Sequence, residues 1–287
     1  MPAITMPRIA AIQMNSLGDV APNLARARDL LADAAARGAQ LAVLPENFAL
    51  MGAHETDKLS VAEADGANGT DTTIQTFLSE AAREYGLWII AGTIPLASPE
   101  PDRVYAACLV YDDTGERVAR YDKIHLYDVG LPESRESYRE SATFVAGETT
   151  PVLVDSPFGR IGLTICYDLR FPELYRRLSA AGADMIVAPS AFTHTTGRAH
   201  WHVLTRARAV ENLAALIAPN QAGHHANGRQ TYGHSLIVDA WGQVQAEAQA
   251  NGEDGDDANE VIIADIDLKR QDELRTGFPC LSHRRLS

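Results

Sequence analysis

The sequence predicts a mixed α/β protein, built either on one mixed sheet or on two sheets covered by helices. Short runs rich in β-branched residues alternate with segments that have the 3.6-residue apolar period of helices. Several runs follow one another with only a turn between them, so those strands can pair antiparallel, unlike the strands of a strict βα repeat. No linker and no fixed-period repeat divides the 287 residues. We therefore expect one domain over residues 1–287.

The N-terminal half predicts strands and helices in alternation. The segment 23–39 keeps one helical face apolar and stops at Gly38, and the segment 71–87 stops in the same way at Gly86. The strands expected in this half are 8–15, 40–46, 88–95 and a hairpin within 104–126 that turns at "DDTG".

The C-terminal half continues the pattern. A strand at 159–168 leads into a helix at 169–184, and a second helix is expected at 199–213. The acidic stretch "QANGEDGDDAN" (249–259) is expected to be a solvated surface loop between strands. The remaining strands are expected at 185–192, 214–223, 233–242 and 260–268.

The composition excludes several classes of function. A net charge of −13 argues against nucleic-acid and anionic membrane partners, because both need a basic surface. No run approaches the ~18 apolar residues of a membrane span, and the N-terminal segment lacks the pattern of a secretory signal. Three cysteines do not make a disulfide framework, so we expect a cytoplasmic protein.

Cys166, in "GLTICYDLRFPELY" (162–175), is the first candidate for chemistry. Free cysteine is often a core residue, and the two other cysteines, Cys108 and Cys280, have only that interpretation. Cys166 instead comes at a predicted strand end, before a polar turn and a helix, where ligands collect in α/β folds. A thiol near a helix N-terminus is also ionised more easily. This placement favours a nucleophile.

A nucleophilic thiol needs a base and a group that stabilises an oxyanion. Glu46 follows the predicted strand "QLAVLPE", and Lys123 lies in "RYDKIHLYD" among apolar and aromatic neighbours. Each alone is also compatible with an ordinary surface charge. Together with Cys166 they form a narrower pattern, whereas no G-x-S-x-G motif is present.

These motifs resemble those of the nitrilase superfamily of carbon–nitrogen hydrolases. The matching stretches run through most of the chain in the family's order: "LAVLPENF" (41–48), "RYDKIHLYD" (120–128), "ESATFVAGE" (140–148), "GLTICYDLRFPELYR" (162–176), "PSAFTHTTGRAHWHVLTRARAVEN" (189–212), "YGHSLIVDAWG" (232–242) and "FPCLSHRR" (278–285). The resemblance implies a four-layer α-β-β-α sandwich, a homodimer, and an enzyme that needs no cofactor and no metal.

The resemblance also implies roles for the residues. Glu46 would take the thiol proton and later activate water, and Cys166 would attack the carbonyl to give a thioester. Lys123 and the backbone N–H of Tyr167 would stabilise the oxyanion, and ammonia would leave. Glu140 matches a second glutamate that positions the lysine and the substrate.

The stretches "ICYDLRFPELYR" and "PSAFTHTTGRAHW" resemble the branch that contains deaminated glutathione amidase and omega-amidase. The resemblance implies that Arg170 and Thr196 contact a substrate carboxylate, for which the planar arginine fork is suited, and that Phe192 forms an apolar wall. An ion pair of Arg170 with Asp168 or Glu173 is the structural alternative.

The resemblance does not decide which enzyme of the superfamily the sequence encodes. The loop "HHANGR" (224–229) offers polar and basic groups for a longer, peptide-like substrate, which favours deaminated glutathione amidase over omega-amidase. Nitrilases and carbamoylases share the same triad. Thr193, His194 and Ala240 depart from the family's pattern, and the first two leave the pocket shape undetermined.

Two other classes compete with this interpretation. A metal-dependent amidohydrolase would use the nine histidines, but His200 and His202 point to different faces of a helix and are not expected to share a metal. A binding protein that kept only the fold would have no reason to retain the three residues of the triad.

Overall fold

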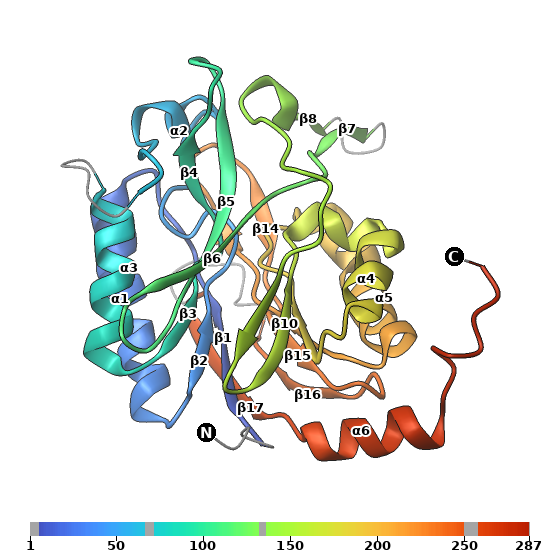
Figure 1. The fold of residues 1–287 in the computed structure, drawn as a ribbon. Coiled ribbons are helices and arrows are strands. Elements are labelled where there is room, and N and C mark those ends of the chain that lie inside the picture. Colours follow the sequence, from blue (N-terminus) through green and yellow to red (C-terminus); the bar gives the residue numbers. More distant parts are fainter. Residues whose placement is uncertain (1–5, 67–71, 132–135, 250–257, 287) are drawn as a thin grey trace.

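The computed structural model describes residues 6–66, 72–131, 136–249 and 258–286 (Figure 1). Two sheets form its centre. The first has the order β17-β1-β2-β3-β5-β4, with β6 paired to β5. Its strands are β1 (Arg8–Gln13), β2 (Leu41–Val43), β3 (Trp88–Ile90), β4 (Ile94–Ala97), β5 (Val104–Tyr111), β6 (Arg117–Asp122) and β17 (Glu260–Asp265).

The second sheet has the order β16-β15-β12-β11-β10-β9. In each sheet three central strands are parallel and the flanking strands are antiparallel, so both sheets are mixed, as the sequence predicts. The strands of the second sheet are β9 (Leu153–Ser156), β10 (Gly159–Leu163), β11 (Met185–Val187), β12 (Ala215–Ala218), β15 (Leu236–Val238) and β16 (Val244–Glu247).

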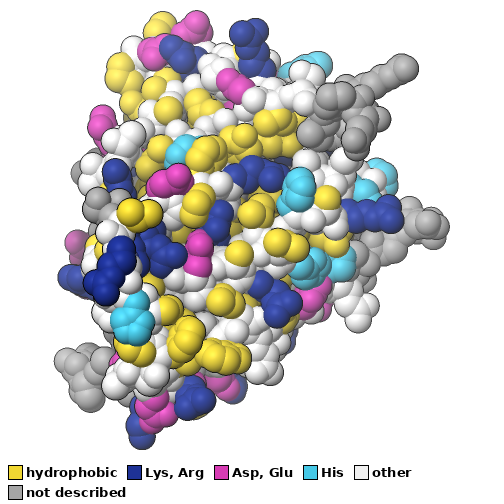
Figure 2. All heavy atoms as spheres, turned by 90° about the vertical axis from the view of Figure 1, so that its right-hand side faces the viewer, with side chains coloured by type: hydrophobic (Ala, Val, Ile, Leu, Met, Phe, Trp, Pro, Cys, Tyr) yellow, Lys and Arg dark blue, Asp and Glu magenta, His cyan; other side chains and the backbone are white. Residues whose placement is uncertain are grey.

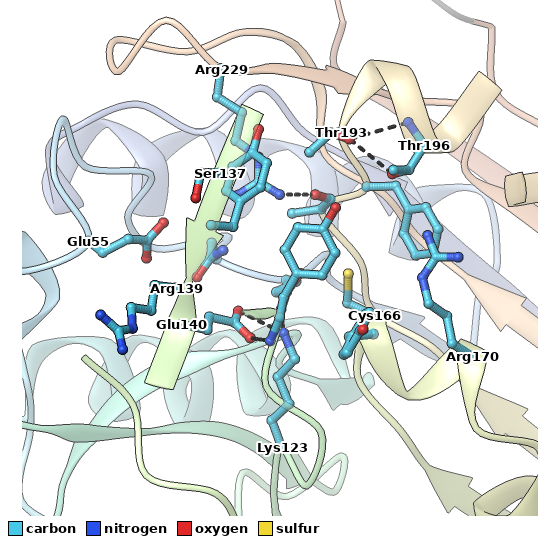
Figure 3. Close-up of a pocket in the computed structure, with 17 residues that line it drawn as sticks. Glu55, Lys123, Ser137, Arg139, Glu140, Cys166, Arg170, Thr193, Thr196 and Arg229 are labelled. Atoms are coloured by element: carbon cyan, nitrogen blue, oxygen red, sulfur yellow. Dashed lines mark hydrogen bonds and ion pairs between the residues drawn. The ribbon is translucent and has the colours of Figure 1, made fainter. Parts of the chain in front are cut away.

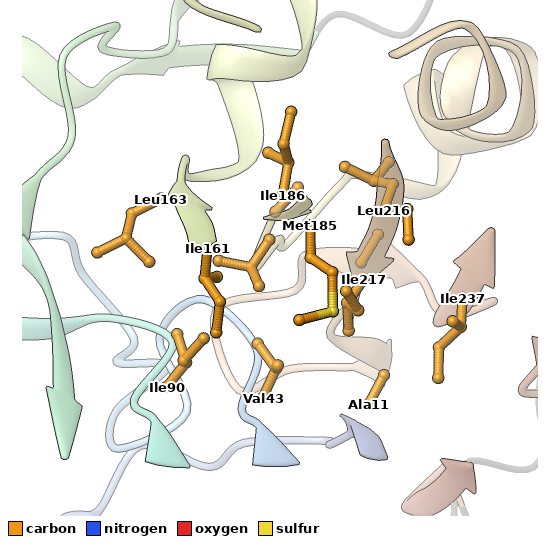
Figure 4. Close-up of a cluster of buried hydrophobic side chains, with 14 of the residues drawn as sticks. Ala11, Val43, Ile90, Ile161, Leu163, Met185, Ile186, Leu216, Ile217 and Ile237 are labelled. Carbon is orange, nitrogen blue, oxygen red and sulfur yellow. The ribbon is translucent and has the colours of Figure 1, made fainter. Parts of the chain in front are cut away.

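The sheets pack face to face. Side chains such as Val43 and Ile90 of the first sheet and Ile161 and Ile217 of the second share one buried apolar cluster (Figure 4). These residues occupy alternate positions of short apolar strands, so one face of each sheet is buried against the other. The interface between the sheets is therefore the main core.

Helices cover the outer faces of both sheets (Figure 1). The helices α1 (Val20–Ala36) and α3 (Thr73–Tyr85) pack on the first sheet and form a second apolar cluster with it. The helices α4 (Pro172–Ala180) and α5 (His194–Asn212) contribute buried side chains to the cluster of the second sheet. The result is a four-layer α-β-β-α sandwich, which confirms the expected fold class.

The other elements lie outside these layers. Two hairpins, β7–β8 and β13–β14, each form a two-stranded sheet. None of the helices in the described ranges is both long and apolar enough to cross a bilayer. The elements are β7 (Asp128–Leu131), β8 (Glu136–Arg139), β13 (Ala222–His224), β14 (Gln230–Tyr232), α2 (Asp57–Ser60), α6 (Leu268–Gly277) and the 3₁₀ helices Glu140–Ala142 and Cys166–Arg170.

Several predicted boundaries are wrong for local reasons. The strand expected at 159–168 ends at Leu163, and α4 begins only at Pro172, because a 3₁₀ helix intervenes. Helix α5 begins at His194 rather than 199, since Thr193 caps it by accepting a hydrogen bond from the N–H of Thr196 at 3.3 Å. The hairpin turn at "DDTG" is confirmed by β5 and β6. Most of the acidic loop expected at 249–259 lies outside the described residues.

Candidate active site

One cavity collects loops from both sheets (Figure 3). Glu46 follows β2, Lys123 follows β6, Cys166 follows β10, and Phe192 follows β11. Since β2 lies in the first sheet and β10 and β11 in the second, the cavity brings together the carboxyl ends of parallel strands from both sheets, and the edge strand β6 adds Lys123. The cavity contains about 660 Å³ of empty space, including its opening to solvent.

A buried ion-pair cluster forms its floor. The Nζ atom of Lys123 lies 2.8 Å from Oε1 of Glu46 and 2.8 Å from Oε1 of Glu140. The Lys123 side chain is only 1% exposed. The two carboxylates raise the pKa of Lys123 well above its usual value against the opposing effect of burial, so the ammonium stays charged.

Close backbone packing fixes the members of this cluster. A Cβ atom on Gly92 would lie 2.0 Å from the carbonyl oxygen of Pro45, the residue before Glu46. A Cβ atom on Gly147 would lie 2.2 Å from the carbonyl oxygen of Asp122, the residue before Lys123. Both positions therefore require glycine. The amide of Glu140 itself donates to the carbonyl of Tyr127, while its Oε2 accepts from the Tyr127 N–H at 2.6 Å.

Cys166 lies beside the cluster in an unusual backbone conformation. Its φ is +44°, in the left-handed region that non-glycine residues rarely adopt. Its amide donates to the Pro189 carbonyl at 2.9 Å, which holds this turn between two strand ends. Strain of this kind is kept where the surrounding structure fixes it, often at functional sites.

The surroundings of Cys166 favour the protonated thiol. Burial raises its pKa, and the Glu46 carboxylate raises it further, while Lys123 acts in the opposite direction. Burial and Glu46 thus act against the ionisation that a nearby helix N-terminus favours. A base within the cavity is needed to make the thiolate.

Asp168, which sequence reasoning considered only as a partner of Arg170, ties the nucleophile's turn to the lysine's loop. Its fully buried carboxylate accepts hydrogen bonds from the Ile165 N–H at 2.8 Å and from the Tyr121 hydroxyl at 2.6 Å. It also contacts Nδ1 of His125 at 2.7 Å. In the sequence, its partners are thus the residue directly before Cys166 and two residues that flank Lys123.

Comparisons with known proteins agree with this geometry. The carbon-nitrogen hydrolase family model matches residues 8–276. The chain belongs to the carbon–nitrogen hydrolase family. It is 43% identical to the deaminated glutathione amidase of Synechocystis over 96% of this chain and 97% of the relative, and 40% identical to that of Yersinia enterocolitica over 96% and 92%.

A solved structure leads to the same superfamily. The crystal structure of Saccharomyces cerevisiae Nit3, a member of branch 10 of the nitrilase superfamily, matches with a TM-score of 0.86 and 29% identity. The match covers 100% of this chain and 99% of that one. This carbon–nitrogen hydrolase is therefore an amidase of the nitrilase superfamily, which acts on carbon–nitrogen bonds other than peptide bonds.

The other end of the hydrolase's cavity holds the residues expected to contact substrate. The guanidinium of Arg170 lies 5.4 Å from the ring centre of Phe192 and 5.8 Å from that of Tyr167, and Nη1 is 3.2 Å from Nδ1 of His200. Among the described residues no carboxylate forms an ion pair with Arg170, so the alternative pairing with Asp168 or Glu173 is wrong. The hydroxyl of Thr196 lies 2.9 Å from that of Thr193.

Sequence reasoning did not single out Arg229, although it noted the loop that ends there. Arg229 also lines the cavity, together with Glu55 and Tyr138. Its charge was visible in "HHANGR", but its distance from Cys166 along the chain gave no sign that it reaches the same cavity.

The histidines do not gather in the cavity of this hydrolase. His200 contacts Arg170, whereas Nε2 of His202 lies 2.8 Å from Oε1 of Glu247, as does Nδ1 of His234. His202, His234 and Glu247 form a cluster of metal-ligand type on the surface, and none of them lines the cavity. His200 and His202 thus have separate partners, as expected.

Proposed function

We propose that the protein is a cysteine-dependent amidase in which Glu46, Lys123 and Cys166 form the catalytic triad. The main support is the arrangement in one cavity of a protonated buried thiol, a carboxylate beside it and an ammonium held 2.8 Å from that carboxylate. Glu140 positions Lys123 from its other side. The cluster of two carboxylates and one ammonium has a net charge of about −1.

The first half of the reaction transfers the acyl group to sulfur. Glu46 takes the proton of Cys166 as sulfur attacks the carbonyl carbon, and the carbonyl π electrons move to oxygen. The Lys123 ammonium and the Tyr167 N–H stabilise this oxyanion. The C–N bond then breaks, the amine leaves with the proton from Glu46, and a thioester remains on Cys166. Proton transfer from the thiol to Glu46 leaves the net charge of the cluster and Cys166 taken together unchanged, so it adds no net charge to the buried site.

The second half releases the acid. Glu46, again a carboxylate, takes a proton from water as the oxygen attacks the thioester carbonyl. Collapse of the second tetrahedral species breaks the C–S bond, and the proton on Glu46 returns to sulfur. Cys166 and Glu46 are thereby restored to their starting states.

The proposed substrate is a small amide with a carboxylate on its acyl part, of the deaminated glutathione type. Two relatives bear that amidase's name, and Arg170 offers a cation that no carboxylate pairs with in the described ranges. Arg170 and Thr196 bind the substrate carboxylate, and Phe192 forms an apolar wall. Omega-amidase activity on 2-oxoglutaramate or succinamate is the alternative, since those substrates carry the same kind of carboxylate.

The leaving group follows from the substrate. Ammonia, expected from the sequence, is released only from primary amides such as succinamate. Glutathione is γ-glutamyl-cysteinyl-glycine, so hydrolysis of the corresponding amide in its deaminated form releases cysteinylglycine. An assay must therefore detect both amines.

The test is a substrate panel with the purified protein. Deaminated glutathione, 2-oxoglutaramate, succinamate, a carbamoyl amino acid and a simple nitrile are compared by kcat/KM, with ammonia and cysteinylglycine both measured. We expect deaminated glutathione to be preferred. A clear preference for 2-oxoglutaramate or succinamate would favour omega-amidase, and activity confined to nitriles or carbamoyl compounds would contradict the proposal.

A metal-dependent mechanism is tested in the same assay. The proposal predicts that a thiol reagent inactivates the enzyme and that a strong chelator does not. Inactivation by the chelator but not by the thiol reagent would indicate that a metal-activated water, rather than Cys166, is the nucleophile.

We also propose a cytoplasmic homodimer. All three cysteines are free thiols, as is usual in a reducing compartment. The exposed large apolar side chains include Val203 and Val210 of α5, and Trp241 and Phe278; Figure 2 views the molecule from the side of α4 and α5, where apolar side chains are interspersed with basic ones. Light scattering of the purified chain should give twice the 31.0 kDa mass, and a monomer mass would contradict the dimer.

A further inference from the structure

Arg229 enters the cavity from a different element than the residues of the triad. It directly precedes β14 in the β13–β14 hairpin, and its side chain points into the cavity (Figure 3). In the same view Arg170 approaches from the other side, with Cys166 between the two arginines. The cavity thus has a cation on each side of the nucleophile.

The hairpin holds Arg229 in place. His225, only 6% exposed, contacts the Ser16 carbonyl through Nδ1 at 3.0 Å and the Thr231 hydroxyl through Nε2 at 2.7 Å. Nδ2 of Asn227 donates to the Gly52 carbonyl at 3.1 Å. The tip of the hairpin is therefore tied to the loops after β1 and β2, which keeps Arg229 preorganised.

The guanidinium of Arg229 uses only part of its N–H donors within the described residues. Its Nη2 donates to the Ala191 carbonyl, and its guanidinium carbon lies 5.2 Å from the ring centre of Tyr138. Its Nε is buried without a hydrogen-bond partner, which is costly for a charged group. Donors of the terminal nitrogens are left to bind a ligand in the cavity that Arg229 lines.

No carboxylate of the described residues forms an ion pair with Arg229. Glu55, the acidic residue that lines the same part of the cavity, accepts from Nζ of Lys58 at 2.5 Å and attracts Arg229 through space without an ion-pair contact. Arg229 therefore differs from Lys123, whose charge is compensated by two carboxylates. A fixed arginine with an open fork and an aromatic ring beside it is suited to bind a carboxylate.

We propose that Arg229 binds a carboxylate on the amine side of the scissile amide, opposite the acyl-side carboxylate bound by Arg170. The preferred substrates are then amides that carry a carboxylate at both ends. This inference rests on the proposed function and favours deaminated glutathione amidase over omega-amidase. Deaminated glutathione carries the glycine carboxylate on its leaving group, whereas succinamate and 2-oxoglutaramate release ammonia and have no amine-side carboxylate.

The test compares three substrates with wild type and Arg229→Gln. The substrates are deaminated glutathione, its C-terminal glycinamide, which lacks the amine-side charge, and succinamate. For Arg229→Gln we expect kcat/KM for deaminated glutathione to fall by about 10–100-fold, mostly through KM, since a charge-assisted contact is lost. For the other two substrates we expect a change within about twofold. Arg229→Lys should recover part of the loss, because it keeps the charge but not the fork.

Two further variants give the comparison its controls. Arg198→Gln, at an exposed position of α5 outside the cavity, should behave as wild type with all three substrates. Arg170→Gln should weaken all three, because each retains the acyl-side carboxylate. An equal loss for all three substrates in Arg229→Gln, or no loss for deaminated glutathione, would overturn the assignment of Arg229. If the wild type hydrolyses none of the amides, the proposed function fails instead.

Discussion

Two sets of residues in the cavity differ in how their charges are balanced. In the reaction set, formed by Glu46, Lys123, Glu140 and Cys166, the ammonium has two carboxylate partners and is 1% exposed. In the substrate-binding set, formed by Arg170 and Thr196 on one side of Cys166 and Arg229 on the other, neither arginine has an ion-pair partner among the described residues. Both arginines are also only partly buried.

The difference separates two tasks. A compensated buried cluster can move a proton between sulfur and carboxylate without changing its net charge, so it can serve any substrate with an amide. Arginines without an ion-pair contact among the described residues keep donors for the ligand and so select which amide binds. Changes in the reaction set should abolish the chemistry, and changes in the substrate-binding set should alter the choice of substrate.

Replacing the nucleophile should give the largest effect. For Cys166→Ala we expect amide hydrolysis to fall by at least about 10³-fold, because no other group can form the thioester. The measurement is amine release at saturating substrate, with circular dichroism to confirm folding. Cys280→Ala, at the half-exposed thiol in the C-terminal tail, is the matched control and should keep wild-type activity. Hydrolysis by Cys166→Ala near the wild-type rate would refute the mechanism.

Removing the ammonium should harm both activity and stability. Lys123→Met leaves Glu46 and Glu140 buried without their cation, so we expect a loss of about 3–5 kcal/mol in the free energy of unfolding and of about 10³-fold in kcat. Urea denaturation and steady-state kinetics measure the two effects. The double variant Lys123→Met/Glu140→Gln should regain part of the stability and none of the activity. A double variant no more stable than the single one would mean that the carboxylates are not destabilised by losing the lysine.

Asp168→Asn should have an intermediate effect, because it acts through the position of its neighbours. The amide can replace only part of the acceptor capacity used by Ile165, Tyr121 and His125. We expect kcat to fall by about 10–100-fold with KM little changed. The conservative variant Asp168→Glu, which keeps the charge in another place, should not restore kcat. Wild-type kcat in Asp168→Asn would show that this carboxylate does not position Cys166.

The last prediction concerns the pH dependence of stability and the hairpin that carries Arg229, and it leaves activity at neutral pH unchanged. Burial lowers the pKa of His225 to about 4, below its unfolded value of about 6.5. The stability from keeping this histidine neutral is present above about pH 6.5 and is lost as the pH falls toward 4, amounting to up to about 3 kcal/mol. Urea denaturation at pH 7 and pH 4.5 should show a larger decline for wild type than for His225→Gln. Equal declines would exclude His225 as the source.

The sequence was sufficient for the features that depend on local patterns. Short apolar runs and amphipathic helices predicted the mixed sheets, and the strand ends before Glu46 and Cys166 predicted where polar residues meet. The sequence did not predict the 3₁₀ helix that begins at Cys166. The positive φ of Cys166 depends on a hydrogen bond to the Pro189 carbonyl in the loop after β11.

The remaining features depend on contacts between distant segments. Asp168 was expected only as an ion-pair partner of Arg170, because nothing in the local sequence shows that Tyr121 of β6 and His125 of the following loop reach it. Arg229 was only one charge in a polar loop until the hairpin placed it opposite Arg170. The pKa of Cys166 likewise follows from burial and from Glu46 rather than from its own helix.

The central claim is that a thioester forms on Cys166, and partitioning with hydroxylamine tests it most directly. Succinamate and N-methylsuccinamate share one acyl group but release different amines. At a fixed hydroxylamine concentration, a common thioester predicts the same ratio of succinyl hydroxamate to succinate from both, and no hydroxamate from Cys166→Ala. A ratio that changes with the leaving amine, or hydroxamate formed by Cys166→Ala, would contradict the mechanism.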